Sequence, residues 1–472
     1  MTAAKCFGLC LLFLLPLQTV AVVSDSWIHA PPKPIGDGTD YEAIGFGIYR
    51  GYGWCTHRSD PAWKKPYQDF DPQGYAEVIE SSGPVVPDTN RPPLLPAWIG
   101  LTYHVLPRGP IAFAFIRLSL AVAIALGCAL FCTWGWLLCR NSQSVWLQQN
   151  ATFVAGITLL IACSERNLRN YATDFLTEPF ALLGAASFLL SSWWAVRNRS
   201  SYAFLMSGAI FGLLVHCRSL FVLWLPMLLV FLYSMTRCHS LISRRHALGL
   251  SVFWSIGVIA VLMPWWIRNS LMLEDWMPLG TKGQTTLLGG YCDESLANAG
   301  EWQFAPERRL RERIQVESES DFDSQKPRAW LDREKRIARE AWTEVQCWCG
   351  SHASDIPRLV IQRMVTEWNP YSGKALVLKL FAMVGLFWLI RNDLQILQWL
   401  LIPLLINTFW VAALYSVGGR FLVPTYGCLY VLAAVGVAGA LRAVTEFGNR
   451  RNHRTASPHP RINRPSSASE SH

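Results

Sequence analysis

Two acidic residues lie close together in a short polar stretch that follows the first apolar segment of the chain. Asp37 stands between two glycines, and Asp40 follows three residues later, immediately before Tyr41. A carboxylate at such a place can act as a general base. Thr39 and Glu42 have the spacing of a capping box, which predicts a helix with Thr39 as its N-cap, lying along the membrane surface. Unpaired N–H groups at this helix start would stabilise a carboxylate at Asp37, although Asp37 could simply close the Gly-Asp-Gly turn.

Four arginines could supply the opposite charge. Arg91 precedes a Pro-Pro pair, which stiffens the backbone and presents the side chain from a defined position. Arg218, Arg268 and Arg420 stand at the ends of apolar segments, where a cation is costly unless it has a partner. The guanidinium group is a planar fork of donors that binds phosphate. We therefore expect a lipid phosphate as the ligand, with a carboxylate nearby as base. Further polar candidates for this site are Tyr41, Asp174, Glu178 and Asn269.

The elements that must position these residues are apolar segments of membrane length. Of the 472 residues, 51% are hydrophobic and only 16% are charged. The hydrophobic residues collect in blocks of about twenty, the length that spans a bilayer core. This pattern excludes a soluble protein and predicts an all-α polytopic membrane protein with about ten transmembrane helices. The expected spans are residues 6–23, 111–138, 145–163, 176–196, 202–217, 220–235, 247–267, 375–390, 394–417 and 423–444.

The basic residues indicate how the spans are oriented. If Lys5 is cytoplasmic, the short inner turns hold Arg140, Arg197 and Arg391 among others, as the positive-inside rule requires. Two long loops, 24–108 and 268–374, then face the extracytoplasmic side, together with the polar candidates. An uncleaved first helix would anchor the first loop, although a cleaved signal peptide is an alternative.

Residues 1–444 are expected to form one membrane domain, with few features outside it. The segment 445–472 is basic and low in complexity, which is typical of a disordered cytoplasmic tail. The net charge of +9 is explained by Lys and Arg residues on the cytoplasmic side, as in other membrane proteins. We therefore expect no nucleic-acid partner. Within the second long loop, residues 307–344 carry Arg and Glu at helical spacing, which predicts a solvated helical hairpin.

Cysteine and histidine patterns indicate neither a metal site nor a cofactor. No Cys/His grouping has the spacing of a zinc site, and no Gly-rich phosphate loop is followed by Lys-Ser or Lys-Thr. Cys55, Cys292, Cys347 and Cys349 fall in the two long loops. A disulfide among them is possible on an oxidising side of the membrane, but spacing alone does not determine a pairing.

An ordered set of motifs resembles the GT-C class of integral-membrane glycosyltransferases. The nearest branch is the bacterial one related to protein mannosyltransferases and aminoarabinose transferases, and the resemblance extends over nearly the whole chain. In order, the motifs are Asp37-Gly-Thr-Asp-Tyr41, Arg91-Pro-Pro-Leu, Thr177-Glu178-Pro, Pro264-Trp-Trp-Ile-Arg268-Asn269, Pro278-Leu-Gly-Thr with Gly283, and Arg420-Phe-Leu-Val-Pro424.

The resemblance implies a polyprenyl-phosphate sugar as donor and a hydroxyl-bearing acceptor on the periplasmic or lumenal face. It places Asp37 at the catalytic carboxylate of the first loop, with Asp40 as the second candidate. It places Arg91 at the basic residue that meets the donor phosphate. By their charge and position, Arg268, with Arg420 or Arg218, is expected to help neutralise that phosphate. Relatives often have a second acidic residue directly after the catalytic one, where this chain has Gly38. A mechanism that needs an adjacent acidic pair, including one built on a bound metal, is therefore not expected.

Two other classes of membrane protein would share some of these features. A transporter or flippase of a lipid-linked saccharide would also need outer arginines and many spans, but not a long first loop with a fixed carboxylate. A membrane acyl- or phosphotransferase would typically need a histidine base or a metal cluster. The sequence leaves the sugar and the acceptor open; the acceptor could be a lipid, a glycan or a protein. The expected location is the bacterial inner membrane, with the site on the periplasmic face.

Overall fold

The computed structural model describes residues 1–34, 36–240, 243–318, 326–369 and 372–455. The expectations for Ile35 and for the basic residues 456–472 lie outside this part. Within it, nine helical segments are long and apolar enough to cross a membrane. This confirms the prediction of an all-α polytopic membrane protein. The tenth expected span is present as an apolar helix of 17 residues, Ser201–Cys217.

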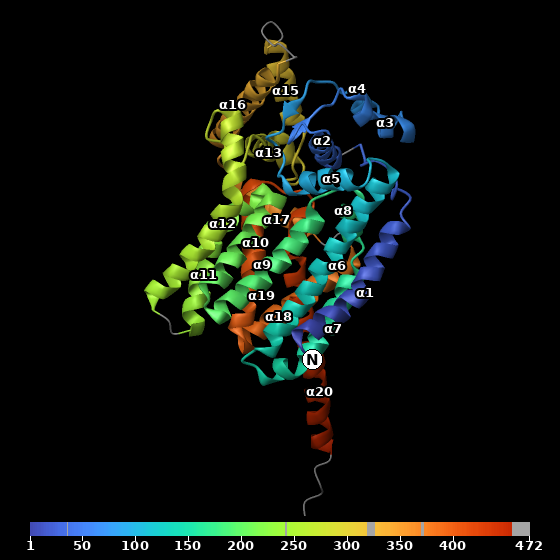
Figure 1. Cartoon of the computed structure of the whole chain (residues 1–472). Helices are drawn as coiled ribbons and strands as arrows, with labels where there is room; N and C mark the ends of the chain where they lie inside the picture. The colour runs from blue at the N-terminus through green and yellow to red at the C-terminus, as the bar shows by residue number, and fades with distance from the viewer. Residues whose placement is uncertain (35, 241–242, 319–325, 370–371, 456–472) are drawn as a thin grey trace, which may run out of the picture.

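The helices of membrane length form a bundle in which α6 is central (Figure 1). Helix α6 packs against α1, α7 and α9, while α10 packs on α12 and α18 on α20. The α10–α12 contact is close because both helices present glycine: a Cβ on Gly208 would lie 2.0 Å from the carbonyl oxygen of Trp254. The bounds are α1 Ala3–Val23, α6 Pro110–Arg140, α7 Val145–Ser164, α9 Glu178–Asn198, α10 Ser201–Cys217, η1 Ser219–Trp224, α11 Leu225–Ser240, α12 Arg244–Leu273, α18 Gly373–Asn392, α19 Leu394–Leu414, η2 Arg420–Thr425 and α20 Tyr426–Thr455.

The two long loops form a cap at one end of the bundle, away from the N-terminus (Figure 1). The first loop contains a two-stranded antiparallel sheet, in which Cys55 pairs with Pro87 and Thr56 with Val86. The second contains the predicted hairpin, whose helices α15 and α16 pack Leu310 and Ile314 with Ile337. The elements of the cap are α2 Gly38–Tyr49, β1 Cys55–Thr56, α3 Pro61–Phe70, α4 Ala76–Glu80, β2 Val86–Pro87, α5 Leu94–Val105, α13 Lys282–Gly290, α14 Asp293–Ala297, α15 Ala305–Ser318, α16 Pro327–Ser351 and α17 Ile356–Trp368. A short helix outside the two long loops, α8 Asn167–Thr173, connects α7 to α9.

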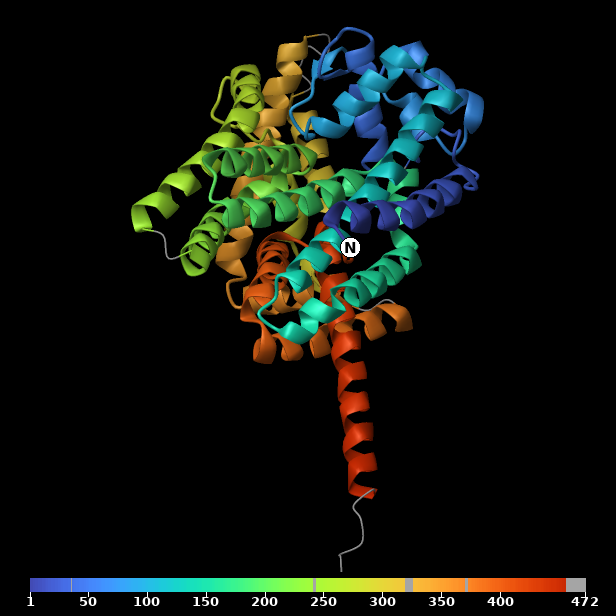
Figure 2. The ribbon, with the colours of Figure 1, turned by 60° about the horizontal axis from the view of Figure 1, so that its bottom comes forward.

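At the opposite end, α20 continues beyond the boundary that the sequence predicted. Figure 2 shows this helix projecting from the bundle, and it ends only at Thr455. The expectation of an irregular tail from residue 445 is therefore wrong for its first part. An ion pair one helical turn apart, Arg442 Nε with Glu446 Oε1 at 2.7 Å, supports the helix where the apolar residues end.

Candidate functional site

Asp37 lies immediately before helix α2, as the sequence predicted, but the cap is not the predicted capping box. The N-cap residue is Asp37, and Thr39 already lies within the first turn. Glu42 does not reach back to the helix start, because its carboxylate accepts hydrogen bonds from Trp63, Tyr67 and Arg108. These hydrogen bonds direct the Glu42 side chain away from the N-terminus of α2. They connect the helix to α3 through Trp63 and Tyr67, and to the segment after α5 through Arg108.

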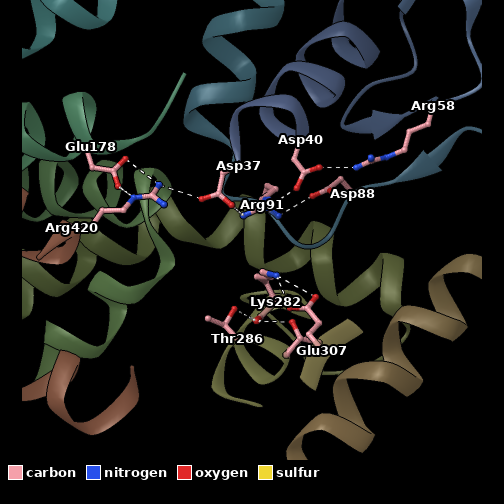
Figure 3. Close-up of polar contacts among 11 residues, drawn as sticks. Asp37, Asp40, Arg58, Asp88, Arg91, Glu178, Lys282, Thr286, Glu307 and Arg420 are labelled. Carbon is pink, nitrogen blue, oxygen red and sulfur yellow. Dashed lines mark hydrogen bonds and ion pairs between the residues drawn. The ribbon is translucent and has the colours of Figure 1, made fainter. Parts of the chain in front are cut away.

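Arg91 joins the two acidic residues of the first motif (Figure 3). Its Nη1 lies 2.8 Å from Asp37 Oδ1, and its Nη2 lies 2.5 Å from Asp40 Oδ2. The guanidinium also lies 5.4 Å from the ring centre of Tyr41. Asp88 fixes the backbone just before the Pro-Pro pair by accepting the N–H of Arg91 at 2.9 Å. The rigid presentation of Arg91 expected from its neighbours is thus reinforced by an Asx turn.

Arg420 reaches the same carboxylate from the other end of the chain (Figure 3). Its Nη2 lies 3.2 Å from Asp37 Oδ2, while its Nε and Nη2 both contact Glu178. Arg218 adds a second cation to Glu178 at 3.4 Å. The break expected between the spans 202–217 and 220–235 is present, because α10 ends at Cys217 and η1 begins at Ser219.

A buried carboxylate holds the turn that carries Arg420. Glu367, on α17, accepts the backbone N–H groups of Gly419 at 3.2 Å and Phe421 at 2.9 Å. Its other contacts are the N–H of Leu422 and the hydroxyl of Ser416. Three backbone donors converging on one carboxylate leave little freedom to residues 419–422, so the direction of the Arg420 side chain is determined largely from α17.

The charges around Asp37 favour its ionised form. Burial alone would raise the pKa of Asp37, but the charges of Arg91 and Arg420 outweigh burial and hold the pKa below its ordinary value. Asp40 behaves in the same way: burial is outweighed by Arg91 and Arg58, and its pKa is lowered. Asp37 is therefore an unprotonated carboxylate at neutral pH, and its side chain is 29% exposed. It is therefore in contact with solvent.

The structure places three sequence candidates outside this group of ion pairs. Arg268 donates to the carbonyl oxygens of Asp88 at 2.5 Å and Trp54 at 3.0 Å. Asn269 donates to the carbonyl of Pro278, and Asp174 pairs with Lys33 at 2.6 Å. These contacts brace the loops that carry the site. The role expected for Arg268 as a phosphate ligand has no support in this geometry, because its Nη1 and Nη2 already donate to Asp88, Asn269 and Trp54.

Three residues of the site were not predicted. Arg58 forms an ion pair with Asp40 at 2.7 Å, and Asp88 supports Arg91. Lys282 pairs with Glu307 at 3.1 Å, in the part of the second loop nearest Arg91 (Figure 3). Only Lys282 had a signal in the sequence, since it directly follows the Pro-Leu-Gly-Thr motif. Arg58 and Asp88 join the site through the β1–β2 pairing, which no local pattern showed.

The two long loops contact each other beside Arg91. The hydroxyl of Thr281 donates to Asn90 Oδ1 at 2.5 Å, and the N–H of Thr281 donates to the carbonyl of Thr89 at 3.2 Å. Gly280 has φ +79°, and a Cβ there would lie 1.7 Å from the carbonyl oxygen of Thr89, so only glycine fits. The second loop is therefore built against the segment that presents Arg91.

Taken together, the three carboxylates of Asp37, Asp40 and Glu178 form ion pairs with four arginines, namely Arg58, Arg91, Arg218 and Arg420. Such a group can take up an anion, because an entering phosphate can replace a carboxylate as the partner of an arginine. Within the described residues, no three His, Cys, Asp or Glu side chains are grouped to hold a metal ion. Cys55, Cys292, Cys347 and Cys349 are free thiols. No model of a known protein family matches the chain, and no curated protein is similar to it in sequence.

Proposed function

We propose that this protein is an integral-membrane glycosyltransferase of the GT-C type. It transfers a sugar from a polyprenyl-phosphate donor to a hydroxyl acceptor on the extracytoplasmic face, the periplasmic side of a bacterial inner membrane. The observation that carries the proposal is the position of Asp37. This accessible carboxylate lies at the start of α2 between two arginines, Arg91 from the first loop and Arg420 from η2.

The reaction follows from the charges. The acceptor hydroxyl oxygen attacks the anomeric carbon of the sugar and forms the new glycosidic bond, while the bond from that carbon to the phosphate oxygen breaks. The configuration inverts in this direct displacement. Arg91 and Arg420 neutralise the negative charge on the departing lipid phosphate. Asp37 takes the proton of the acceptor hydroxyl as a general base.

The ion pairs also suggest how donor binding activates the base. In the structure, Arg91 and Arg420 lower the pKa of Asp37, which makes it a weak base. A donor phosphate that draws these two arginines toward itself weakens their contacts with Asp37. The pKa of Asp37 then rises, and the carboxylate becomes a better proton acceptor only when the donor is in place.

The test compares wild type with Asp37→Asn in purified full-length protein. Labelled sugar release from a panel of polyprenyl-phosphate donors is measured with water as the default acceptor, and donor binding is measured separately. We expect turnover to fall by about a hundredfold or more while donor binding persists. The matched control is Asp69→Asn, which removes a carboxylate on α3 that is 60% exposed and forms a surface ion pair with Lys65.

Three results would contradict the proposal. If the protein binds none of the donors in the panel, it is not an enzyme that uses a lipid-phosphate sugar. Equal turnover by wild type and Asp37→Asn would exclude Asp37 as the base. Donor movement across the bilayer without sugar release, unaffected by Asp37→Asn, would identify a transporter or flippase of a lipid-linked saccharide instead.

A further inference from the structure

A pocket lined by three cations lies apart from the ion pairs of Asp37. It has a volume of about 640 Å³. Four elements contribute to it: α1, the end of α7, the segment around the start of α8, and the start of α18. Its lining residues are Leu17, Cys163, Ser164, Arg166, Arg169 and Lys374.

The pocket holds three cations that lack an acidic partner. In the described part of the chain, Arg166, Arg169 and Lys374 take part in no ion pair, whereas Arg91, Arg218 and Arg420 are all paired. The Nε atom of Arg169 is buried without a hydrogen-bond partner. Among the described residues, the hydrogen-bond partner of Lys374 Nζ is the carbonyl oxygen of Ser164.

The neighbouring acid does not compensate for this charge. Glu165 does not line the pocket, and its Oε1 accepts the N–H of Asn167 at 3.1 Å. A buried donor without a partner is costly, and several like charges in one pocket repel each other. An anion in the pocket removes both costs.

The location of the pocket indicates what kind of anion fits. Ser164 is the last residue of α7 and Gly373 the first of α18, and both helices are of membrane-spanning length. The cations therefore lie where two spans leave the bilayer, at the depth of lipid headgroups, while Leu17 of α1 provides an apolar wall. Basic pockets between transmembrane helices are known to bind anionic lipid headgroups on the cytoplasmic side of membranes, and the same charge attraction applies to these three cations.

We propose that Arg166, Arg169 and Lys374 bind a phosphate group, with the headgroup of an anionic phospholipid as the source that the depth of the pocket favours. The bound group would hold α8 against the ends of α1, α7 and α18. Helix α8 leads directly to Asp174, whose carbonyl oxygen lies against Gly38 at the start of α2. This inference does not depend on the proposed glycosyl transfer.

The test uses full-length protein in an uncharged detergent. The unfolding temperature is measured during separate titrations with short-chain phosphatidylglycerol, short-chain phosphatidylcholine and inorganic phosphate, since a ligand that binds the folded state raises it. The variant Arg166→Gln/Arg169→Gln/Lys374→Gln removes the three cations. The control Arg140→Gln/Arg197→Gln/Arg391→Gln removes three exposed cations at the ends of spans on the opposite side.

We expect saturable stabilisation of the wild type by phosphatidylglycerol and none by phosphatidylcholine. The triple variant should bind about a hundredfold more weakly, because each cation near an anionic headgroup contributes a factor of about five. Equal stabilisation by inorganic phosphate would support the phosphate site and identify free phosphate as its source. If the triple variant does not fold, Arg166→Gln alone, at an exposed side chain, should weaken binding about fivefold.

Three results would overturn the proposal. The first is equal stabilisation by phosphatidylglycerol and phosphatidylcholine. The second is an unchanged response in the variants Arg166→Gln and Arg166→Gln/Arg169→Gln/Lys374→Gln. The third is an equal loss in the control variant, which would show that total charge and not this pocket determines binding.

Discussion

Replacing Glu42 by Gln tests how the structure holds the helix that follows Asp37. The Glu42 carboxylate is fully buried and accepts four hydrogen bonds. One oxygen accepts from Trp63 Nε1 at 2.7 Å and Tyr67 at 2.8 Å. The other accepts from Tyr103 at 2.9 Å and Arg108 Nε at 2.6 Å. An amide can replace only one oxygen as an acceptor, so two donors lose their partner or must reorient.

The expected cost is about 3 kcal/mol of the free energy of unfolding. Removing one member of a buried ion pair typically costs about 3–5 kcal/mol, because the other charge stays buried. The lower end applies here, since Arg108 keeps the carbonyls of Ala62 and Trp63 as partners. Denaturant unfolding of wild type and Glu42→Gln in mixed micelles measures this difference. Glu80→Gln, at an exposed residue of α4, is the matched control.

A double-mutant cycle with Arg108→Gln isolates the pair. We expect the double variant to be more stable than the sum of the two single effects predicts, because neither charge is then left buried alone. A loss of about 0.5 kcal/mol or less in Glu42→Gln, the range of ordinary surface substitutions, would refute the reasoning. Strict additivity in the cycle would show that the two residues act independently.

Three further outcomes are expected. Gly38→Ala should destabilise the protein by about 1–3 kcal/mol, because the new Cβ would lie 2.5 Å from the carbonyl oxygen of Asp174, whereas Gly8→Ala in open space should not; denaturant unfolding measures both. Wild type should have a larger free energy of unfolding than Asp37→Asn, with the full difference present above pH 3.8, the ordinary pKa of an aspartate. The difference should shrink as the pH falls, because the pKa of Asp37 is lowered in the folded state. A difference that grows in acid would contradict this. Arg420→Lys should lower kcat/KM for sugar transfer about a hundredfold, because lysine lacks the planar fork of donors with which Arg420 contacts Glu178 through both Nε and Nη2. An unchanged value would remove this arginine from the mechanism.

Local patterns predicted the fold class and part of the candidate site. Blocks of apolar residues near bilayer length showed where the spans lie, since a span needs only length and hydrophobicity. The residue types next to Arg218 and Arg91 predicted two further features. These are the break between the spans 202–217 and 220–235 and the rigid presentation of Arg91. The prediction for Glu42 was wrong because a capping box describes only one helix turn. It contains no information about Trp63 or Arg108, which take the carboxylate instead.

The amino-acid sequence by itself determined that the chain is a helical membrane protein with acidic and basic residues gathered at one side of the bilayer. These properties depend on hydrophobicity and on charge near the ends of spans, which are readable along the chain. Only the tertiary structure decided which charges meet. Asp37 contacts Arg420, distant in sequence, while Arg268 turns to backbone carbonyls. Ion pairing depends on distances of a few ångströms, and these are set by packing between distant elements.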